Sequence, residues 1–168
     1  MQKNRPKIKV PFQTVDVLIE LLSVTLILLA WVYVAIEYNE LPDTIASHFN
    51  SKGQPDGYSS KNSILFLPIL ATIMYLSLFI LNKFPHLHNY MVNITEDNAL
   101  KNYRFSTRIL RVVNFFVVLL FSYIVYTIIA SAKGSTLSLG DWFLPTIIGV
   151  SILLPIGLIL YQRKLNKS

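Results

Sequence analysis

Four long, uninterrupted apolar blocks dominate the pattern of the chain. They run approximately over residues 17–36, 64–81, 109–130 and 142–161. At about 1.5 Å of rise per residue, each block as a helix is close to the length that crosses about 30 Å of hydrocarbon. In a soluble domain, apolar residues would instead recur with the period of a helix or a strand. The pattern predicts an all-α integral membrane protein with four transmembrane helices, folded as one membrane domain over residues 1–168.

The connection over residues 37–63 is long for a link between neighbouring helices and is rich in Pro, Gly, Asp, Asn and Ser. We therefore expect it to be folded. Residues 41–49 are predicted to form a short helix in which Asp43 accepts from the free backbone N–H groups at its start. Residues 54–57, with the sequence Gln-Pro-Asp-Gly, have the composition of a tight turn.

The connection over residues 82–108 contains a helix start. Thr95 is followed by two acidic residues, which are favourable at the positive end of a helix dipole. We expect this helix to continue into the third span. Arg104, Arg108 and Arg111 then share one face, and we interpret them mainly as anchors at the membrane boundary.

Composition and charge support the membrane assignment and indicate which side of the membrane each segment faces. The chain is 53% hydrophobic and 14% charged, with a formal net charge of +6. A nucleic-acid binder would carry that charge as a basic face on a soluble fold, so nucleic acid is not an expected partner. Only Lys52, Lys61 and Lys133 lie in the first and third connections. By the positive-inside rule, both termini and the 82–108 loop are cytoplasmic, and the 37–63 loop is outside. The twelve other basic residues are Lys3, Arg5, Lys7, Lys9, Lys83, Lys101, Arg104, Arg108, Arg111, Arg163, Lys164 and Lys167.

The outer loop brings together side chains that could bind a ligand. Asp43, His48, Asn50 and Asp56 supply two carboxylates, an imidazole and an amide, which are ligands a divalent metal can use. No paired-histidine metal spacing accompanies them, and we predict no metal site. The plainer interpretation is that they cap a helix, satisfy turns and pack at the surface. Because loops often carry function, the alternative is recognition of a ligand or peptide by these four residues together with Lys61.

The first span begins with polar residues at helical spacing. Asp16 and Glu20 are one turn apart, and Ser23 continues their face. A carboxylate facing lipid is costly, so Glu20 should face another helix, with Arg111 and Asn114 entering from the same side. One interpretation is an ion pair between helices. The other is a proton or cation relay, although the central parts of the spans lack ionisable residues.

We found no sequence signature of catalysis. There is no Gly-x-Ser-x-Gly motif and no glycine loop that could cradle a phosphate. Cysteine is absent, which excludes disulfides, thiolate metal sites and a cysteine nucleophile. The sequence therefore predicts a protein that is not an enzyme and needs no cofactor.

Two segments carry a distinctive spacing of residues. The first consists of Leu41, Pro42, His48, Phe49, Asn50, Gly53, Pro55, Asp56, Gly57, Ser60 and Lys61, and the second of Asn89, Tyr90, Ile94, Thr95, Glu96, Asn98 and Tyr103. These segments resemble the bacterial membrane family called domain of unknown function 1648. The resemblance covers roughly residues 15–130 and implies a multi-pass protein of the bacterial cell membrane. Some relatives protect their producer against a secreted killing peptide, as does the immunity protein of the sporulation-delaying killing system.

Three functional hypotheses follow. The first is recognition of, or protection against, a membrane-active peptide through the outer loop. The second is a small transporter or channel subunit in which Glu20, Ser23 and Asn114 line a polar path after oligomerisation. The third is a structural or signalling partner of another membrane protein. The expected partners are the lipid bilayer and, in the first and third cases, a peptide or a membrane protein.

Overall fold

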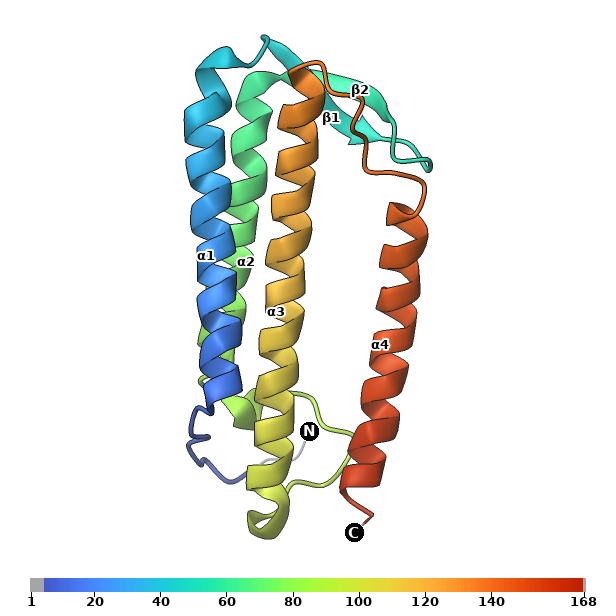
Figure 1. Ribbon diagram of the computed structural model, residues 1–168. Helices are drawn as coiled ribbons and strands as arrows, with labels where there is room; N and C mark the ends of the chain where they lie inside the picture. The colour runs from blue at the N-terminus through green and yellow to red at the C-terminus, as the bar shows by residue number, and fades with distance from the viewer. Residues whose placement is uncertain (1–4, 168) are drawn as a thin grey trace.

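The computed structural model describes residues 5–167 and has four long helices. They are α1 (Thr14–Glu37), α2 (Phe66–Leu81), α3 (Glu96–Ala132) and α4 (Phe143–Leu165) (Figure 1). A 3₁₀ turn, Lys61–Leu65, leads into α2. By length and composition all four are apolar enough to cross a membrane, so the four predicted spans are confirmed. The chain is a mostly helical, multi-pass membrane protein.

Helices α1, α2 and α3 lie side by side, whereas α4 stands apart from them (Figure 1). At mid-height, Ile27, Tyr75 and Val118 are buried together, one from each of the three helices. The described N- and C-terminal ends lie at one end of the bundle, which we call the termini end. The opposite end carries a β-hairpin, and we call it the hairpin end.

The expectation of an all-α fold with a short helix over residues 41–49 is wrong. Strand β1 (Thr44–Phe49) pairs antiparallel with β2 (Pro55–Ser60) in a two-stranded sheet. Asp43 therefore caps no helix; its carbonyl accepts from the N–H of Lys61 at 2.9 Å and extends the pairing beyond the strands. Tertiary packing explains the difference, because Ile45 is buried against the helices while Thr44 and His48 stay exposed.

The turn of the hairpin lies earlier than residues 54–57. The side chain of Asn50 accepts from the N–H groups of Lys52 and Gln54 at 2.9 and 3.1 Å, and Gly53 adopts a φ of +69°. An asparagine that binds the backbone of the following residues drives such a turn. Gly57 lies instead within β2 opposite His48, where a Cβ would come 2.9 Å from the Cβ of His48.

The hairpin and the residues that flank it are packed onto the bundle by apolar side chains. Leu41, Ile45 and Ile64 are at most 4% exposed. They form one core cluster with residues near the ends of α1 and α3. This burial makes the 37–63 segment an ordered cap on the helices. The helix residues of the cluster are Val34, Val125, Ile128 and Ile129.

Helix α3 begins where the sequence predicts. The side chain of Asn98 accepts from the N–H of Thr95 at 3.0 Å, which satisfies a backbone donor at the helix start. The helix then continues for 37 residues through the third apolar block. Arg104, Arg108 and Arg111 are therefore part of the same continuous helix.

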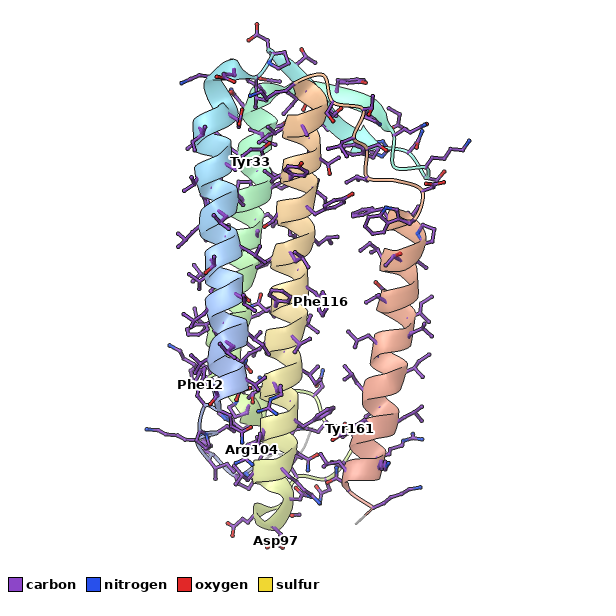
Figure 2. All side chains as sticks on the ribbon, viewed as in Figure 1. Phe12, Tyr33, Asp97, Arg104, Phe116 and Tyr161 are labelled. Atoms are coloured by element: carbon purple, nitrogen blue, oxygen red, sulfur yellow. The ribbon has the colours of Figure 1, made fainter. Side chains whose placement is uncertain are left out.

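Helix α4 is attached to the bundle at its two ends. At the termini end, Asn102 and Asn166 exchange two side-chain hydrogen bonds of 2.9 and 3.0 Å. Figure 2 shows Tyr161 reaching toward α3, where its ring lies 4.9 Å from that of Phe105. Gln162 is the one described residue of α4 that is buried. Most of α4 is thus free to contact lipid.

The tip of the hairpin touches the segment that leads into α4. The N–H of Leu139 donates to the carbonyl of Gly53 at 2.9 Å. A Cβ on Gly53 would lie 2.5 Å from the backbone N and O of Gly140. The lack of a Cβ at Gly53 therefore allows backbone to pack on backbone here.

We predict that Gly53→Ala destabilises this contact by about 2 kcal/mol, because it adds a steric clash to an unfavourable positive φ. Thermal unfolding in detergent measures the loss of stability. Limited proteolysis of the segment between α3 and α4 should become faster in the variant.

Gly134→Ala is the matched control. Gly134 also has a positive φ, of 88°, but a Cβ added there would find nothing within 4 Å. This variant should show the cost of the backbone conformation without the clash. Equal losses in the two variants would contradict a specific role for the contact between the hairpin and the α4 linker.

Candidate functional site

Two clusters of polar residues lie at opposite ends of the bundle, and the first joins α1 to α3. Arg108 Nε lies 3.1 Å from Asp16 Oδ1, and Arg111 Nε lies 3.1 Å from Glu20 Oε1. Arg111 NH1 also approaches Asp16 at 3.7 Å. The side chains of Asp16 and Arg111 are 3% and 5% exposed. The ion pairs expected between these helices are therefore present.

A third helix completes this cluster. The hydroxyl of Tyr75 in α2 donates to Glu20 Oε2 at 2.8 Å. Asn114 donates to the carbonyl of Tyr75 at 3.2 Å, and Ser23 donates to the carbonyl of Ile19 at 2.8 Å. Sequence reasoning missed Tyr75. The sequence signal for Tyr75 was a tyrosine inside an apolar block. A buried tyrosine hydroxyl usually forms a hydrogen bond, so a polar partner could have been expected.

The polar cluster ends abruptly toward the hairpin end. Beyond Ser23 and Asn114, the buried positions of α1 and α3 are mainly apolar, such as Ile27, Val118 and Val125. The Oδ1 atom of Asn114 is buried and has no hydrogen-bond partner in the described part of the chain. The cluster is thus a compact group of charged residues in the part of the apolar region nearest the termini end.

The second cluster lies on the exposed face of the hairpin. His48 Nδ1 lies 2.5 Å from Asp56 Oδ1, with side chains 73% and 42% exposed. Tyr58, which sequence reasoning also missed, is 65% exposed on β2. The structure therefore presents an imidazole, a carboxylate and a phenol on an ordered surface.

The other predicted loop residues have structural contacts. The Asn50 side chain accepts the backbone hydrogen bonds that form the turn. Lys61 Nζ donates to the carbonyl of Leu41 at 3.4 Å and lies 3.7 Å from the fully exposed carboxylate of Asp43. Such an exposed pair contributes little to stability. Within residues 5–167, no group of three or more His, Cys, Asp or Glu gathers in a way that could hold a metal.

A lysine bridge supports the hairpin end. Lys133, directly after α3, lies 2.5 Å from Glu37 and 2.7 Å from Glu40. Lys133 donates hydrogen bonds to the carboxylates of Glu37 and Glu40, and these bonds raise the pKa of Lys133. The contact ties the end of α1 to the end of α3 below the hairpin.

The two ends of the molecule differ strongly in charge. Among residues 5–167, the termini end holds eleven Lys and Arg against four Asp and Glu. The hairpin end holds three Lys against five Asp and Glu. Lys3, part of the basic N-terminal cluster in the sequence, lies outside the described residues. The charge difference found along the sequence is therefore also a difference between two faces of the fold.

Comparison with known proteins locates a domain within this fold. Residues 25–72 match the model of the family described as Domain of unknown function (DUF1648). An uncharacterized protein of Archaeoglobus fulgidus is 32% identical over 76 residues, which covers 40% of this chain and 42% of that protein. The chain thus matches less than half the length of this relative. No solved structure matches the chain.

Four apolar helices, with a charged cluster between α1 and α3, define a multi-pass membrane protein. Its residues 25–72 are a DUF1648 domain, so the family resemblance is confirmed for the first of its two segments. The domain contains the hairpin, the second half of α1 and the first part of α2. The second resembling segment, residues 89–103, lies outside the match and stays a prediction.

We predict that Arg111→Leu destabilises the protein by about 3 kcal/mol, because it leaves the Glu20 carboxylate without a cation among apolar helices. Adding Glu20→Gln to this variant should recover part of the loss, since the uncompensated charge is removed. Thermal unfolding of the two single variants and the double variant gives the coupling energy.

Arg108→Leu is the comparison. Its side chain is 35% exposed, and its partner Asp16 keeps Arg111 nearby, so the loss should be smaller. If the Arg111 and Glu20 changes are simply additive, the two side chains are not energetically coupled.

Proposed function

We propose that this is a non-enzymatic protein of the bacterial cell membrane whose hairpin faces outward and recognises a membrane-active peptide, with a protective role. Both termini then face the cytoplasm. The excess of Lys and Arg at the termini end supports this orientation, because cytoplasmic segments carry more basic residues than external ones.

The observation that carries the proposal is the ordered hairpin. A plain connection between α1 and α2 would need neither paired strands nor a buried core. Here Leu41, Ile45 and Ile64 hold the hairpin on the helices, while His48, Asp56 and Tyr58 remain exposed. Binding residues are commonly placed on loops that a rigid scaffold positions.

A two-stranded sheet also offers a way to bind an extended chain. Each strand pairs with its neighbour on one side and leaves a backbone edge on the other. A peptide can add to such an edge as a further strand, with backbone hydrogen bonds for affinity and side-chain contacts for selectivity. His48, Asp56 and Tyr58 would supply those side-chain contacts.

The position of the DUF1648 domain agrees with this proposal. The matched region is centred on the hairpin and on the parts of α1 and α2 that support it. It leaves out all of α4. The shared unit is therefore the hairpin on its helical support.

The alternative, a transporter or channel subunit, has less support. Glu20 already binds Arg111 and Tyr75, so its charge is matched within the bundle. The buried positions beyond Ser23 and Asn114 are mainly apolar. A role as a structural or signalling partner is the third proposal, and α4, with its exposed apolar surface, is the element that would serve it.

The proposed orientation can be tested directly because the chain contains no cysteine. We predict that a cysteine replacing the exposed Ser51 at the hairpin tip reacts with a membrane-impermeant maleimide in intact cells. A cysteine replacing the exposed Lys164 should react only after permeabilisation. The opposite pattern would reverse the topology.

We predict that expression of the wild-type protein raises the survival of a susceptible bacterium challenged with a panel of membrane-active peptides. His48→Ala with Asp56→Ala should abolish the gain, because it removes the exposed pair of the hairpin. The measurement is survival at matched membrane abundance, together with binding of a labelled peptide to the protein in lipid nanodiscs.

Asp97→Ala with Lys167→Ala is the control, since it removes one acid and one base from exposed positions at the termini end. It should protect like the wild type. Equal survival with the wild type and with the empty vector would reject protection against the peptides tested. A flux that Glu20→Gln abolishes would favour transport instead.

A further inference from the structure

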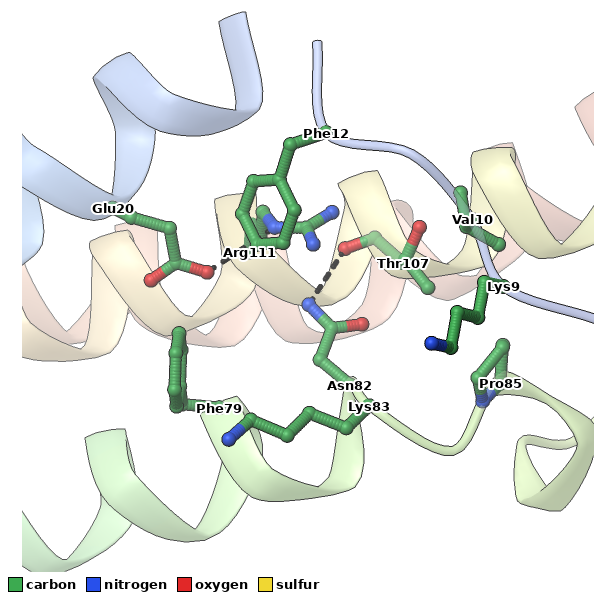
Figure 3. A pocket seen from close by; sticks show the side chains of 10 residues that line it. All are labelled: Lys9, Val10, Phe12, Glu20, Phe79, Asn82, Lys83, Pro85, Thr107 and Arg111. Atoms are coloured by element: carbon green, nitrogen blue, oxygen red, sulfur yellow. Dashed lines mark hydrogen bonds and ion pairs between the residues drawn. The ribbon is translucent and has the colours of Figure 1, made fainter.

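A cavity of about 300 Å³ opens at the termini end between α1, α2 and α3. The segment before α1 supplies Lys9 and Phe12, and the end of α2 supplies Phe79, Asn82 and Lys83 (Figure 3). The α3 side includes Thr107 and Arg111. The hairpin proposal does not involve this site.

The cavity carries unbalanced positive charge. Arg111 is held by Glu20 and by Asp16, and its guanidinium lies 4.3 Å from the centroid of the Phe12 ring. Lys9 and Lys83 line the same cavity, and neither forms an ion pair within the part of the chain that the structure describes. After Glu20 offsets Arg111, the two lysines remain to attract an anion.

A buried acceptor lies among these cations. Asn82 is 8% exposed, and its amide nitrogen donates to the carbonyl of Thr107 at 3.0 Å. Its Oδ1 atom is buried and has no hydrogen-bond partner among residues 5–167. A buried polar atom without a partner is costly, so a donor from a molecule in the cavity would satisfy this oxygen.

The place and the walls of the cavity suit a lipid. It lies at the termini end of the apolar parts of α1, α2 and α3, beside the residues that precede α1 and follow α2. Phe12, Phe79, Val10 and Pro85 form apolar parts of its wall. Basic pockets between transmembrane helices on the cytoplasmic side bind the headgroups of anionic lipids.

We propose that this cavity binds the phosphodiester of an anionic phospholipid whose headgroup carries a hydroxyl, as in phosphatidylglycerol. Lys9 and Lys83 pair with the phosphate, and the headgroup hydroxyl donates to Asn82 Oδ1. The apolar walls contact the glycerol backbone and the first part of the acyl chains. A zwitterionic lipid brings no net charge to balance the lysines, so it binds less tightly.

The test uses the full-length protein in detergent, with native mass spectrometry to measure binding of added phosphatidylglycerol and phosphatidylcholine. The wild type should prefer phosphatidylglycerol. Lys9→Gln with Lys83→Gln should weaken phosphatidylglycerol binding about 25-fold, since each lysine close to an anionic headgroup contributes roughly a fivefold factor.

Lys164→Gln with Lys167→Gln is the matched control. It removes the same charge from exposed positions at the end of α4, outside the cavity. Affinity within twofold of the wild type supports the proposal. Equal loss in both double variants would reduce the effect to general surface charge and overturn it, as would equal binding of the two lipids by the wild type.

Two further experiments test whether the ligand is a lipid and whether its headgroup hydroxyl matters. Soluble glycerol phosphate should compete poorly, because it lacks acyl chains; full displacement of the lipid at equal concentration would assign the site to a soluble phosphate. Asn82→Ala should weaken binding of phosphatidylglycerol more than binding of phosphatidylmethanol, an anionic phosphodiester whose headgroup has no hydroxyl. Equal effects on both would contradict the role of Asn82.

Discussion

A charge inside a membrane must be matched within the protein, and the pairs between α1 and α3 meet this requirement. Asp16 pairs with Arg108 and Glu20 with Arg111, which lie 92 and 91 positions further along the chain. The same offset recurs near the hairpin end, where Val34 and Val125 share one core cluster. The ion pairs therefore fix two parallel helices in one register over most of their length. Slipping either helix by a turn would leave a carboxylate or a guanidinium in hydrocarbon.

This register determines what lies above it. With α1 and α3 aligned, Val34, Val125 and Ile129 offer one apolar platform at the hairpin end, and Lys133 reaches both Glu37 and Glu40. The hairpin places Ile45 on this platform. The positions of the exposed His48 and Asp56 thus depend on the α1–α3 register, which the ion pairs at the termini end help to fix.

The sequence predicted the features that depend on local pattern. Block length gave the four spans, and the acidic residues after Thr95 gave the start of α3. The cost of a carboxylate in lipid gave the pairing of Glu20 with Arg111. The hairpin was missed because neither strand has an alternating hydrophobic sequence pattern: in β1, Ile45 and Ala46 are adjacent and both buried, and β2 is a mostly polar segment that contains Pro55 and Gly57. Its pairing depends on the Asn50 turn and on the platform below, which only the folded chain displays. The cavity was missed for a similar reason, since Lys9, Lys83 and Arg111 come from three distant segments.

The contact between Gly53 and the linker to α4 has a mechanical consequence. Helix α4 is joined to α3 through Asn166 at the termini end, and the hairpin tip touches the chain just before the other end of the helix. Its middle meets little of the protein. A small displacement of the hairpin would therefore tilt α4 about its contact with α3 at the termini end. A change at the hairpin end would then alter the inclination of a helix across the membrane.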